Sequence, residues 1–503
     1  MVVPRPSVSR PLSGAIAALS AHGASATANV ELTGNVTGIT LDSRAVQPGD
    51  IFAALPGALT HGASHSAQAA SRGAVAVFTD PAGRSDAEAT GLAVIVVDNP
   101  RLHLGALSAW TYGNPAKELK IIGITGTNGK TTITYLLEAA FRRLGVLTGV
   151  IGTTGTHIGD ERIESVRTTP ESPDLHAILA LMVERGVQVV AMEISSHSLV
   201  LGRVDGLRVD VACFTHLTWD HIDFHHDMES YYRAKASLFT PDRATSAVIG
   251  TDDSWGTRLA HECVVPFVTV ARQHADWTVA SVDAGSAGQQ CVTVNGPSGA
   301  LEFDLGLPGE FNVLNALGAA ACVERLGYDV ATAVQAFGDV HVPGRMERVD
   351  RGQPFLALVD YAHSPDAIRR VLESVQSTVS GRIIVVVGCG GDRDREKRPG
   401  MGAAAAKGAD VVIVTDDNPR SEDPNAIREA LLAGIALAGS VRASDIREIA
   451  DRALAITTAV ELAEPHDVVL VLGKGHEQGQ EIAGVIHDFD DRVVLAVALE
   501  GRA

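Results

Sequence analysis

The sequence predicts an α/β fold built on parallel sheets. Short apolar runs of strand length alternate with longer segments of helical periodicity, a pattern typical of parallel sheets covered by helices on both faces. Glycine is abundant, at 50 of 503 residues, which suits the many tight strand-to-helix turns of such a fold. A chain of this length exceeds one ordinary core, so two to four domains are expected.

Composition and charge exclude several classes of protein. The formal net charge is −19, whereas nucleic-acid-binding proteins need a basic face, so a nucleic-acid partner is excluded. The five cysteines are widely spaced and include no Cys-x-x-Cys pair, which favours reduced thiols. No apolar run approaches the roughly 20 residues that span a membrane, and Met1 to Pro11 lacks an apolar signal core. We expect a cytoplasmic protein with no membrane partner.

The alternation falls into three blocks, predicted as domains at 1–118, 119–345 and 346–503. Tyr112-Gly-Asn-Pro115 is typical of a linker between the first two. Polar loops follow the strands of the third block, and open α/β sheets bind ligands at the carboxyl ends of their strands, so a second ligand site is expected there. The predicted strands are Ala74–Phe78, Leu92–Val97, Leu119–Ile124, Val187–Ile194, Val209–Phe214, Ser246–Ile249, Phe355–Val359, Ile383–Val387, Val411–Thr415 and Val468–Leu472.

The stretch Gly123-Ile-Thr-Gly-Thr-Asn-Gly-Lys-Thr-Thr132 predicts a site for a nucleoside triphosphate. It follows an apolar strand and precedes a helical pattern that ends before Gly145. Glycines let backbone N–H groups approach phosphate oxygens, and a helix N-terminus favours negative charge. Lys130 is placed to reach the terminal phosphates, and the Thr131 hydroxyl to bind Mg²⁺. The spacing departs from the usual Gly-x4-Gly-Lys pattern by one residue.

Two further predicted strands lead into carboxylate and imidazole side chains, which are residue types that can bind metals. Glu193 ends one of them, and it faces the glycine loop if the two strands are neighbours, which makes it a candidate Mg²⁺ ligand. The other strand leads into Thr215–His226, which holds four histidines and two aspartates. Their spacing fits no usual zinc framework, and no cysteine is in register. The segment therefore favours a single ligating histidine, His221, over a zinc cluster.

The order and spacing of several motifs resemble those of the ATP-dependent Mur ligases of peptidoglycan synthesis. Three motifs carry the resemblance in the middle of the chain: Gly126-Thr-Asn-Gly-Lys-Thr-Thr132, Glu193-Ile-Ser-Ser-His197 and Asp220-His-Ile-Asp-Phe-His225. Further matches extend it over nearly the whole chain: Asp42–Phe52, Phe311–Asn315, Pro343–Glu347, Asp360–His363 and Gly390–Asp394. The resemblance implies a three-domain architecture, with a central parallel-sheet ATPase domain and a Rossmann-like C-terminal domain.

The resemblance also implies the cofactors ATP and Mg²⁺ and the residues that bind them. Those matched to ATP are Gly126, Thr127, Asn128, Gly129, Lys130, Thr131, Thr132, Asn312, Asn315 and Arg345. The residues matched to catalysis are Lys130, Glu193, His221 and Lys235, and those matched to metal are Thr131, Glu193, His221 and Lys235. Lys235 matches a lysine that the family carries as a carbamate, because an amine cannot bind Mg²⁺ but a carbamate oxygen can.

The substrates follow from the same resemblance, which is strongest to members that add meso-diaminopimelate to a UDP-muramoyl-dipeptide. Positions matched to the muramoyl-dipeptide are Ser43, Thr168, Thr169, Ser195 and Arg203. Positions matched to diaminopimelate are Arg393, Asp417, Asn418, Pro419, Arg420, Gly473 and Glu477. Asp417-Asn-Pro-Arg420 is typical of the diaminopimelate-adding members. A guanidinium binds the extra carboxylate of diaminopimelate in a bidentate fork and repels an ammonium.

The expected activity is an ATP-dependent amide ligation through an acyl phosphate, carried out by a cytoplasmic monomer. Three alternatives stay open at this point. One is an L-lysine-adding ligase of the same family, which Asp417–Arg420 disfavours. Another is a folate polyglutamate ligase, which the N-terminal motif at Asp42 disfavours. The last is a nucleotide-binding relative without ligase activity, which the complete set of predicted catalytic residues disfavours.

Overall fold

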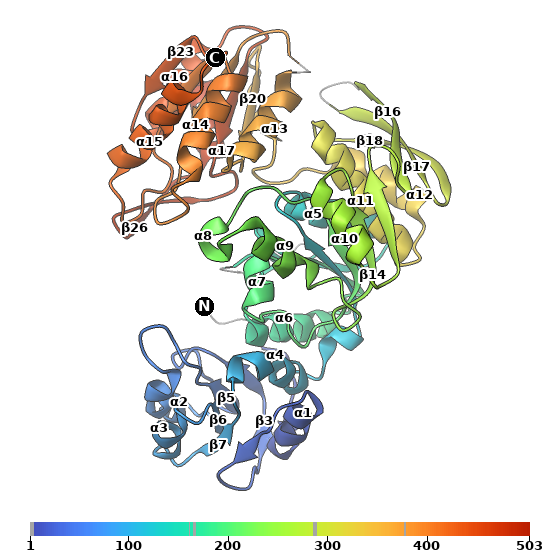
Figure 1. The fold of residues 1–503 in the computed structure, drawn as a ribbon, viewed down its shortest axis with the longest axis vertical. Helices are drawn as coiled ribbons and strands as arrows, with labels where there is room; N and C mark the ends of the chain where they lie inside the picture. The colour runs from blue at the N-terminus through green and yellow to red at the C-terminus, as the bar shows by residue number, and fades with distance from the viewer. Residues whose placement is uncertain (1–4, 160, 164–166, 285–288, 377–378, 503) are drawn as a thin grey trace.

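The computed structural model describes residues 5–159, 161–163, 167–284, 289–376 and 379–502, so the first four residues of the Met1–Pro11 segment lie outside the described part. The chain forms three lobes stacked along its long axis in sequence order, each around its own sheet (Figure 1). Within the described residues, no helix is both long and apolar enough to cross a membrane.

The N-terminal lobe is built on a five-stranded sheet. In spatial order its strands are β2 (Thr27–Ala28), β7 (Ala93–Val96), β6 (Ala76–Thr79), β5 (Asp50–Ala53) and β4 (Gly38–Thr40). All neighbours are parallel except β2 with β7. Its helices are α1 (Ala15–Ala21), α2 (Ser66–Ser71), α3 (Arg84–Glu88) and α4 (Pro100–Thr111).

Helix α4 joins this lobe to the next one. Leu104 and Leu107 of α4 share a buried cluster with Ala177 and Ala180, which belong to α6 (Ser172–Glu184) of the central lobe. One apolar core therefore crosses from the first lobe into the second.

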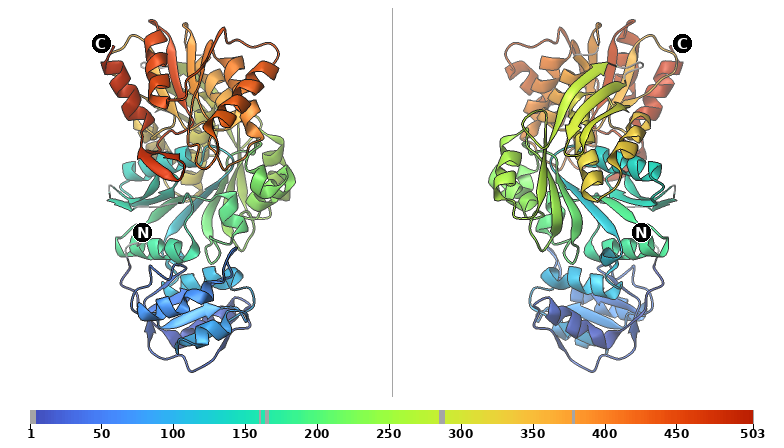
Figure 2. Two further views of the ribbon diagram at one scale, coloured as in Figure 1. Left: turned by 90° about the vertical axis from the view of Figure 1, so that its left-hand side faces the viewer. Right: turned by 90° about the vertical axis from the view of Figure 1, so that its right-hand side faces the viewer.

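The central lobe contains an eleven-stranded mixed sheet. In spatial order its strands are β11 (Glu161–Ile163), β10 (Gly155–Ile158), β9 (Thr148–Gly152), β12 (Val189–Glu193), β8 (Lys120–Thr125), β13 (Val209–Phe214), β14 (Ala244–Gly250), β15 (Phe267–Ala271), β16 (Trp277–Ala284), β17 (Gln290–Gly296) and β18 (Gly299–Leu305). Strands β9 to β16 of this order are parallel, as predicted. The antiparallel strands at both edges were not predicted, and β16–β18 rise beside the C-terminal lobe (Figure 2).

Both faces of the central parallel strands of this sheet are buried, which explains why these strands are continuously apolar. Along β8, Ile122 and Ile124 face one core, whereas Ile121 faces the other, as the two-residue period of a strand requires. The first core is covered by α5 (Lys130–Arg143) and α11 (Glu310–Arg325), and the second by α6. The remaining central helices are α7 (Ser196–Val200), α8 (Ile222–His225), α9 (Met228–Ala236), α10 (Ser254–Glu262) and α12 (Val330–Ala333).

The C-terminal lobe has a six-stranded sheet between two helical layers. Its spatial order is β19 (Glu347–Arg348), β20 (Leu356–Asp360), β24 (Val468–Leu472), β21 (Ile383–Val387), β22 (Val411–Val414) and β23 (Asp445–Glu448), with only β19 antiparallel to its neighbour. One layer comprises α13 (Pro365–Gln376), α14 (Lys397–Gly408) and α15 (Pro424–Leu437), and the other α16 (Arg452–Leu462) and α17 (Asp491–Glu500). A hairpin of β25 (Gly479–Ile482) and β26 (Val485–Asp488) follows β24.

Candidate active site

The glycine loop joins β8 directly to α5. The strand ends at Thr125 and the helix begins at Lys130, with Gly129 as its N-cap. Gly129 has φ +90°, and a Cβ there would lie 2.4 Å from Oδ1 of Asn315. No other residue fits this position without strain. The loop therefore brings backbone close to its neighbours at a helix N-terminus, which is the geometry that binds phosphate.

Two lysines meet at one carbonyl oxygen of this loop. Lys130 Nζ donates to the oxygens of Gly126 at 3.0 Å and Thr127 at 2.8 Å. Lys235 Nζ, from α9, also donates to the Gly126 oxygen, at 2.8 Å. Burial lowers the pKa of Lys130 below its usual value. Two amines converge where the phosphates of a nucleotide would carry their charge.

Thr131 and Glu193 come together as the sequence prediction required. Strand β12 pairs with β8, and Glu193 lies opposite Ile124. Thr131 Oγ1 donates to Glu193 Oε1 at 2.9 Å, while the backbone N–H and hydroxyl of Thr153 donate to the two carboxylate oxygens at 2.8 and 3.0 Å. A hydroxyl and a carboxylate oxygen in contact are hard ligands that fit Mg²⁺.

Lys235 and His221 both lie next to the ring of Tyr231. Lys235 Nζ is 4.7 Å from the centre of the Tyr231 ring, and the His221 ring is 6.1 Å from it. Lys235 is only 1% exposed, and burial, then Lys130, hold the pKa of its amine well below the usual value. The described residues include no group of three or more His, Cys, Asp or Glu side chains suited to a metal, which disfavours the zinc-cluster interpretation.

Beside the loop, a cavity between the central and C-terminal lobes contains three more of the residues matched to ATP. Asn312 and Asn315 line it from α11, and Arg345 lines it from the connection to the next lobe. Asn315 Nδ2 donates to Asn312 Oδ1 at 3.0 Å, and the Arg345 guanidinium lies 4.5 Å from the centre of the Tyr361 ring. Within the described chain, three buried nitrogens of this lining have no hydrogen-bond partner: Asn128 Nδ2, His216 Nε2 and Arg345 Nε. A ligand with acceptor atoms would satisfy them.

Three of the predicted dipeptide residues surround the end of β12. Thr169 Oγ1 donates to the Glu193 carbonyl oxygen at 2.9 Å and accepts from the Ser195 N–H at 3.1 Å. Thr168 Oγ1 is 3.0 Å from Thr153 Oγ1. Arg203 forms an ion pair with Glu171 at 2.8 Å. Glu171 also pairs with Arg101 of α4 at 2.7 Å, so these residues extend from the predicted metal site to the N-terminal lobe.

The fifth predicted dipeptide residue, Ser43, lies in a separate cavity. That cavity opens between the N-terminal and central lobes, and Arg44, Arg101 and Arg167 also line it. Ser43 Oγ donates to Gln68 Oε1 at 2.7 Å. The lining also holds Asp42, Glu171 and Asp174, and two of the arginines are paired with them: Arg44 with Asp42 at 2.9 Å and Arg101 with Glu171 at 2.7 Å.

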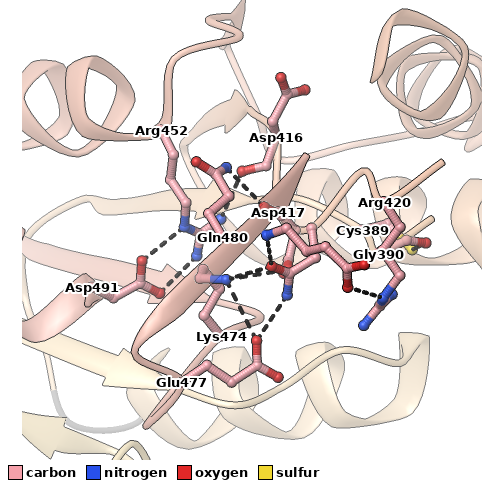
Figure 3. Close-up of polar contacts among 12 residues, drawn as sticks. Cys389, Gly390, Asp416, Asp417, Arg420, Arg452, Lys474, Glu477, Gln480 and Asp491 are labelled. Carbon is pink, nitrogen blue, oxygen red and sulfur yellow. Dashed lines mark hydrogen bonds and ion pairs between the residues drawn. The ribbon is translucent and has the colours of Figure 1, made fainter. Parts of the chain in front are cut away.

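The predicted amine-binding residues meet at the carboxyl ends of β22 and β24 (Figure 3). Asn418 Nδ2 donates to Glu477 Oε2 at 2.8 Å. Gly473 has φ +118°, and a Cβ there would lie 2.5 Å from Asp417 Oδ2. Burial, and then the Asp417 carboxylate, raise the pKa of Glu477 above its usual value. The two carboxylates therefore lie near each other at these strand ends, and we refer to this side-chain cluster as the amine pocket.

Arg420 brings a positive charge to the edge of the same pocket. Its Nη1 donates to the Gly391 oxygen at 2.7 Å, and its Nε lies 3.3 Å from Glu481 Oε2. The residue has φ +53°, a left-handed conformation that costs a side-chain-bearing residue about 1 kcal/mol. Arg393, by contrast, is exposed, and its Nη1 donates to the Asp392 carbonyl oxygen at 3.4 Å. Pro419 is buried between Asn418 and Arg420.

Comparison with known proteins agrees with this geometry. Three family models match: "Mur ligase family, catalytic domain" at residues 35–112, "Mur ligase middle domain" at 124–323 and "Mur ligase, glutamate ligase domain" at 344–475. A curated relative from Streptomyces avermitilis, named UDP-N-acetylmuramoyl-L-alanyl-D-glutamate--2,6-diaminopimelate ligase, is 51% identical over 94% of each chain. The chain belongs to the Mur ligase family.

Two more proteins are similar to this Mur ligase over most of its length. A Corynebacterium glutamicum relative with the same printed name is 47% identical over 92% of each chain. A solved structure, also titled as a UDP-N-acetylmuramoyl-L-alanyl-D-glutamate--2,6-diaminopimelate ligase, is 32% identical, with a TM-score of 0.66 over 94% of this chain and 97% of the other. The three-domain α/β architecture expected for the family is thereby confirmed.

Some pocket residues of this Mur ligase were missed by sequence reasoning. Lys474 is fully buried, and its Nζ donates to Asn418 Oδ1 at 3.0 Å and lies 3.4 Å from Glu477 Oε2. Gln480 Nε2 donates to the Asp417 carbonyl oxygen at 2.8 Å. Lys474 lies between two predicted residues, so its place in the chain was a usable signal. Gln480 and Glu481 gave none, because they reach the pocket only through the β25–β26 hairpin.

Proposed function

We propose that this Mur ligase uses ATP to join an amine of meso-diaminopimelate to the D-glutamate carboxylate of UDP-N-acetylmuramoyl-L-alanyl-D-glutamate, in cytoplasmic peptidoglycan precursor synthesis. The observation that carries this proposal is the cluster of polar side chains at the carboxyl ends of β22 and β24. It brings together the carboxylates of Asp417 and Glu477, and Arg420 lies on the loop that carries Asp417, with its Nε 3.3 Å from Glu481 Oε2. A cation and carboxylates at the same strand ends complement a group bearing both a carboxylate and an ammonium.

The reaction proceeds in two balanced steps. The glutamate carboxylate takes the terminal phosphoryl group of ATP, giving an acyl phosphate and ADP. The neutral amine then attacks the acyl carbon, the C–N bond forms, the C–O bond to phosphate breaks, and a proton leaves the nitrogen. Lys130 and the N-terminus of α5 offset negative charge on the transferring group, while Asn312, Asn315 and Arg345 hold the nucleoside end of ATP.

Mg²⁺ fits two sets of ligands around the loop. Thr131 and Glu193 would hold one ion, and His221 with carbamylated Lys235 a second. When bound, the ions offset phosphate charge. A neutral lysine amine reacts with CO2 to give a carbamate and one proton. Burial lowers the pKa of the Lys235 amine, which favours the neutral form that this reaction needs.

We also propose roles for residues away from the nucleotide loop. Ser43, Thr168, Thr169, Ser195 and Arg203 bind the UDP-muramoyl-dipeptide across the N-terminal and central domains, and Arg393, Pro419 and Gly473 complete the diaminopimelate pocket. The proposed domains are 1–118, 119–345 and 346–503, acting as a monomer.

The direct test is phosphate release from ATP in the presence of the UDP-muramoyl-dipeptide. We expect release that depends on meso-diaminopimelate, with little release when L-lysine or no amine is added. Lysine lacks the distal carboxylate, so it leaves Arg420 to repel its ammonium. Release with lysine alone would make the protein a lysine-adding ligase. Nucleotide binding without release under any condition would make it a non-catalytic relative.

Replacing Arg420 should weaken binding of the amine substrate and leave binding of the other two substrates unchanged. For Arg420→Ala we expect the KM for diaminopimelate to rise roughly thirtyfold, because a charge-assisted hydrogen-bonded pair contributes about 2 kcal/mol. The KM values for ATP and the dipeptide should stay near those of the parent. Arg395→Ala is the matched control, since Arg395 is an exposed arginine of a nearby loop paired with Glu422. An unchanged KM for diaminopimelate in Arg420→Ala would contradict this role.

A further inference from the structure

A buried ion pair lies behind the amine pocket. Arg452, the first residue of α16, and Asp491, the first residue of α17, are both fully buried. The guanidinium binds the carboxylate through two parallel hydrogen bonds, Nε to Oδ1 and Nη2 to Oδ2, each 2.7 Å long. Removing two charges from water is costly, so a buried pair like this adds little net stability compared with well-packed apolar side chains.

The remaining hydrogen bonds of this guanidinium reach two separate strands. Arg452 Nη2 donates to the Leu472 oxygen at 3.0 Å, and Nη1 donates to the Asp416 oxygen at 3.4 Å. Leu472 is the last residue of β24, immediately before Gly473, and Asp416 immediately precedes Asp417. One side chain therefore holds the starting points of both loops that form the pocket (Figure 3).

The sheet itself does not link these two loops. Strand β21 lies between β24 and β22, so no ladder hydrogen bond joins the strands that carry them. Further from the strand ends, other bonds also join the two segments, among them Asn418 Nδ2 to Glu477 Oε2, Gln480 Nε2 to the Asp417 oxygen and the Arg420 N–H to the Glu481 oxygen. Arg452 instead bonds to residues next to the strand ends from which both loops start. The Arg452 guanidinium is fully buried and bonds to carbonyl oxygens on both sides of β21, so substrate atoms do not compete for its hydrogen bonds.

The charge of Arg452 also acts on the pocket. Burial lowers the pKa of its guanidinium, but Asp491, and then Asp417 and Glu477, more than offset this effect and raise the pKa above its usual value. A permanent positive charge therefore lies buried close to both pocket carboxylates.

We propose that Arg452, held by Asp491, is a positioning residue for the amine substrate. It fixes the spacing between the loop after β22 and the loop after β24, so that Asp417, Asn418 and Glu477 face a single ligand. This role rests on the proposed ligase function, because it concerns the pocket for the amine.

The test compares Arg452→Lys with a matched variant at the opposite end of the same sheet. Lysine keeps the charge but cannot bind a carboxylate bidentately and two carbonyls together. Arg382 makes similar bonds where β24 begins, to Asp467 at 2.8 Å and to the Leu462 oxygen at 2.8 Å, far from the pocket loops. Both variants should lose some thermal stability. Only Arg452→Lys should raise the KM for the amine, by roughly ten- to a hundredfold, with kcat and the KM for ATP close to the parent values.

Asp491→Asn is the second variant, because it keeps the shape of the side chain but removes its charge and one of the two oxygens that accept from Arg452. It should raise the amine KM in the same direction as Arg452→Lys. Equal effects of Arg452→Lys and Arg382→Lys on the amine KM, or an unchanged amine KM in both pocket-side variants, would overturn the positioning role. The comparison uses whichever amine the parent protein accepts, so a preference for lysine corrects the proposed substrate and leaves this test decisive.

Discussion

Lys130→Ala should abolish turnover while leaving the fold intact. Lys130 lies at the N-terminus of α5 with its amine turned onto the loop carbonyls, and a bound triphosphate would offer it stronger, anionic acceptors. Removing it takes away a cation that offsets charge in the transition state, which costs at least about a hundredfold in kcat. The measurement is phosphate release with all three substrates, together with the thermal unfolding midpoint.

A lysine from the same strand-and-loop unit provides the control for this variant. Lys120 begins β8, and its exposed side chain pairs with Asp210 at 3.2 Å. Exposed pairs of this kind contribute roughly 0–1 kcal/mol, so Lys120→Ala should retain full activity. Near-normal turnover by Lys130→Ala, or equal losses in the two variants, would refute the assigned role of the loop.

Lys235→Ala should lose activity by a similar factor, at least about a hundredfold, if the carbamate holds a metal ion. The lysine is buried, so truncation leaves a cavity beside the Gly126 carbonyl that a small carboxylate can enter. We therefore expect added acetate to restore part of the activity of Lys235→Ala. Acetate should not restore the activity of Lys130→Ala, because an anion cannot take the place of the missing lysine ammonium.

Mass spectrometry under mild conditions gives an independent test of Lys235. The parent protein should carry the added mass of CO2, and Lys235→Ala should not. Activity of Lys235→Ala that matches the parent, or a loss that no small carboxylate relieves together with an unmodified parent, would remove the carbamate from the mechanism.

The sequence could predict the strands and the glycine loop because their signals are local. Strands β13, β21 and β24 occupy the predicted residues, since uninterrupted apolar runs between turn residues belong to buried parallel strands. The antiparallel strands β17 and β18 were overlooked, although Val292 and Val294 alternate with more exposed neighbours as a strand predicts.

The site was predictable only where neighbouring strands bring distant residues together. Glu193 was expected near Thr131 on the condition that β12 and β8 are neighbours, and the register meets that condition. No such rule leads from Arg452 to Asp491, because two separate helix starts meet behind a sheet. The resemblance to the family did not point to Glu481 either, because its contact with Arg420 depends on the position of the β25–β26 hairpin.

The cluster shared by α4 and α6 has a consequence for how the three lobes move. Separating the first two lobes would expose Leu104 and Leu107 to water, at a cost of roughly 25 cal/mol for each Å² of apolar surface uncovered. This cost opposes their separation, so in the proposed reaction the first two lobes would hold the UDP end and the reacting carboxylate of the substrate at a fixed spacing. The proposed amine site is on the third lobe, so the two reactants would meet only when that lobe lies against the other two.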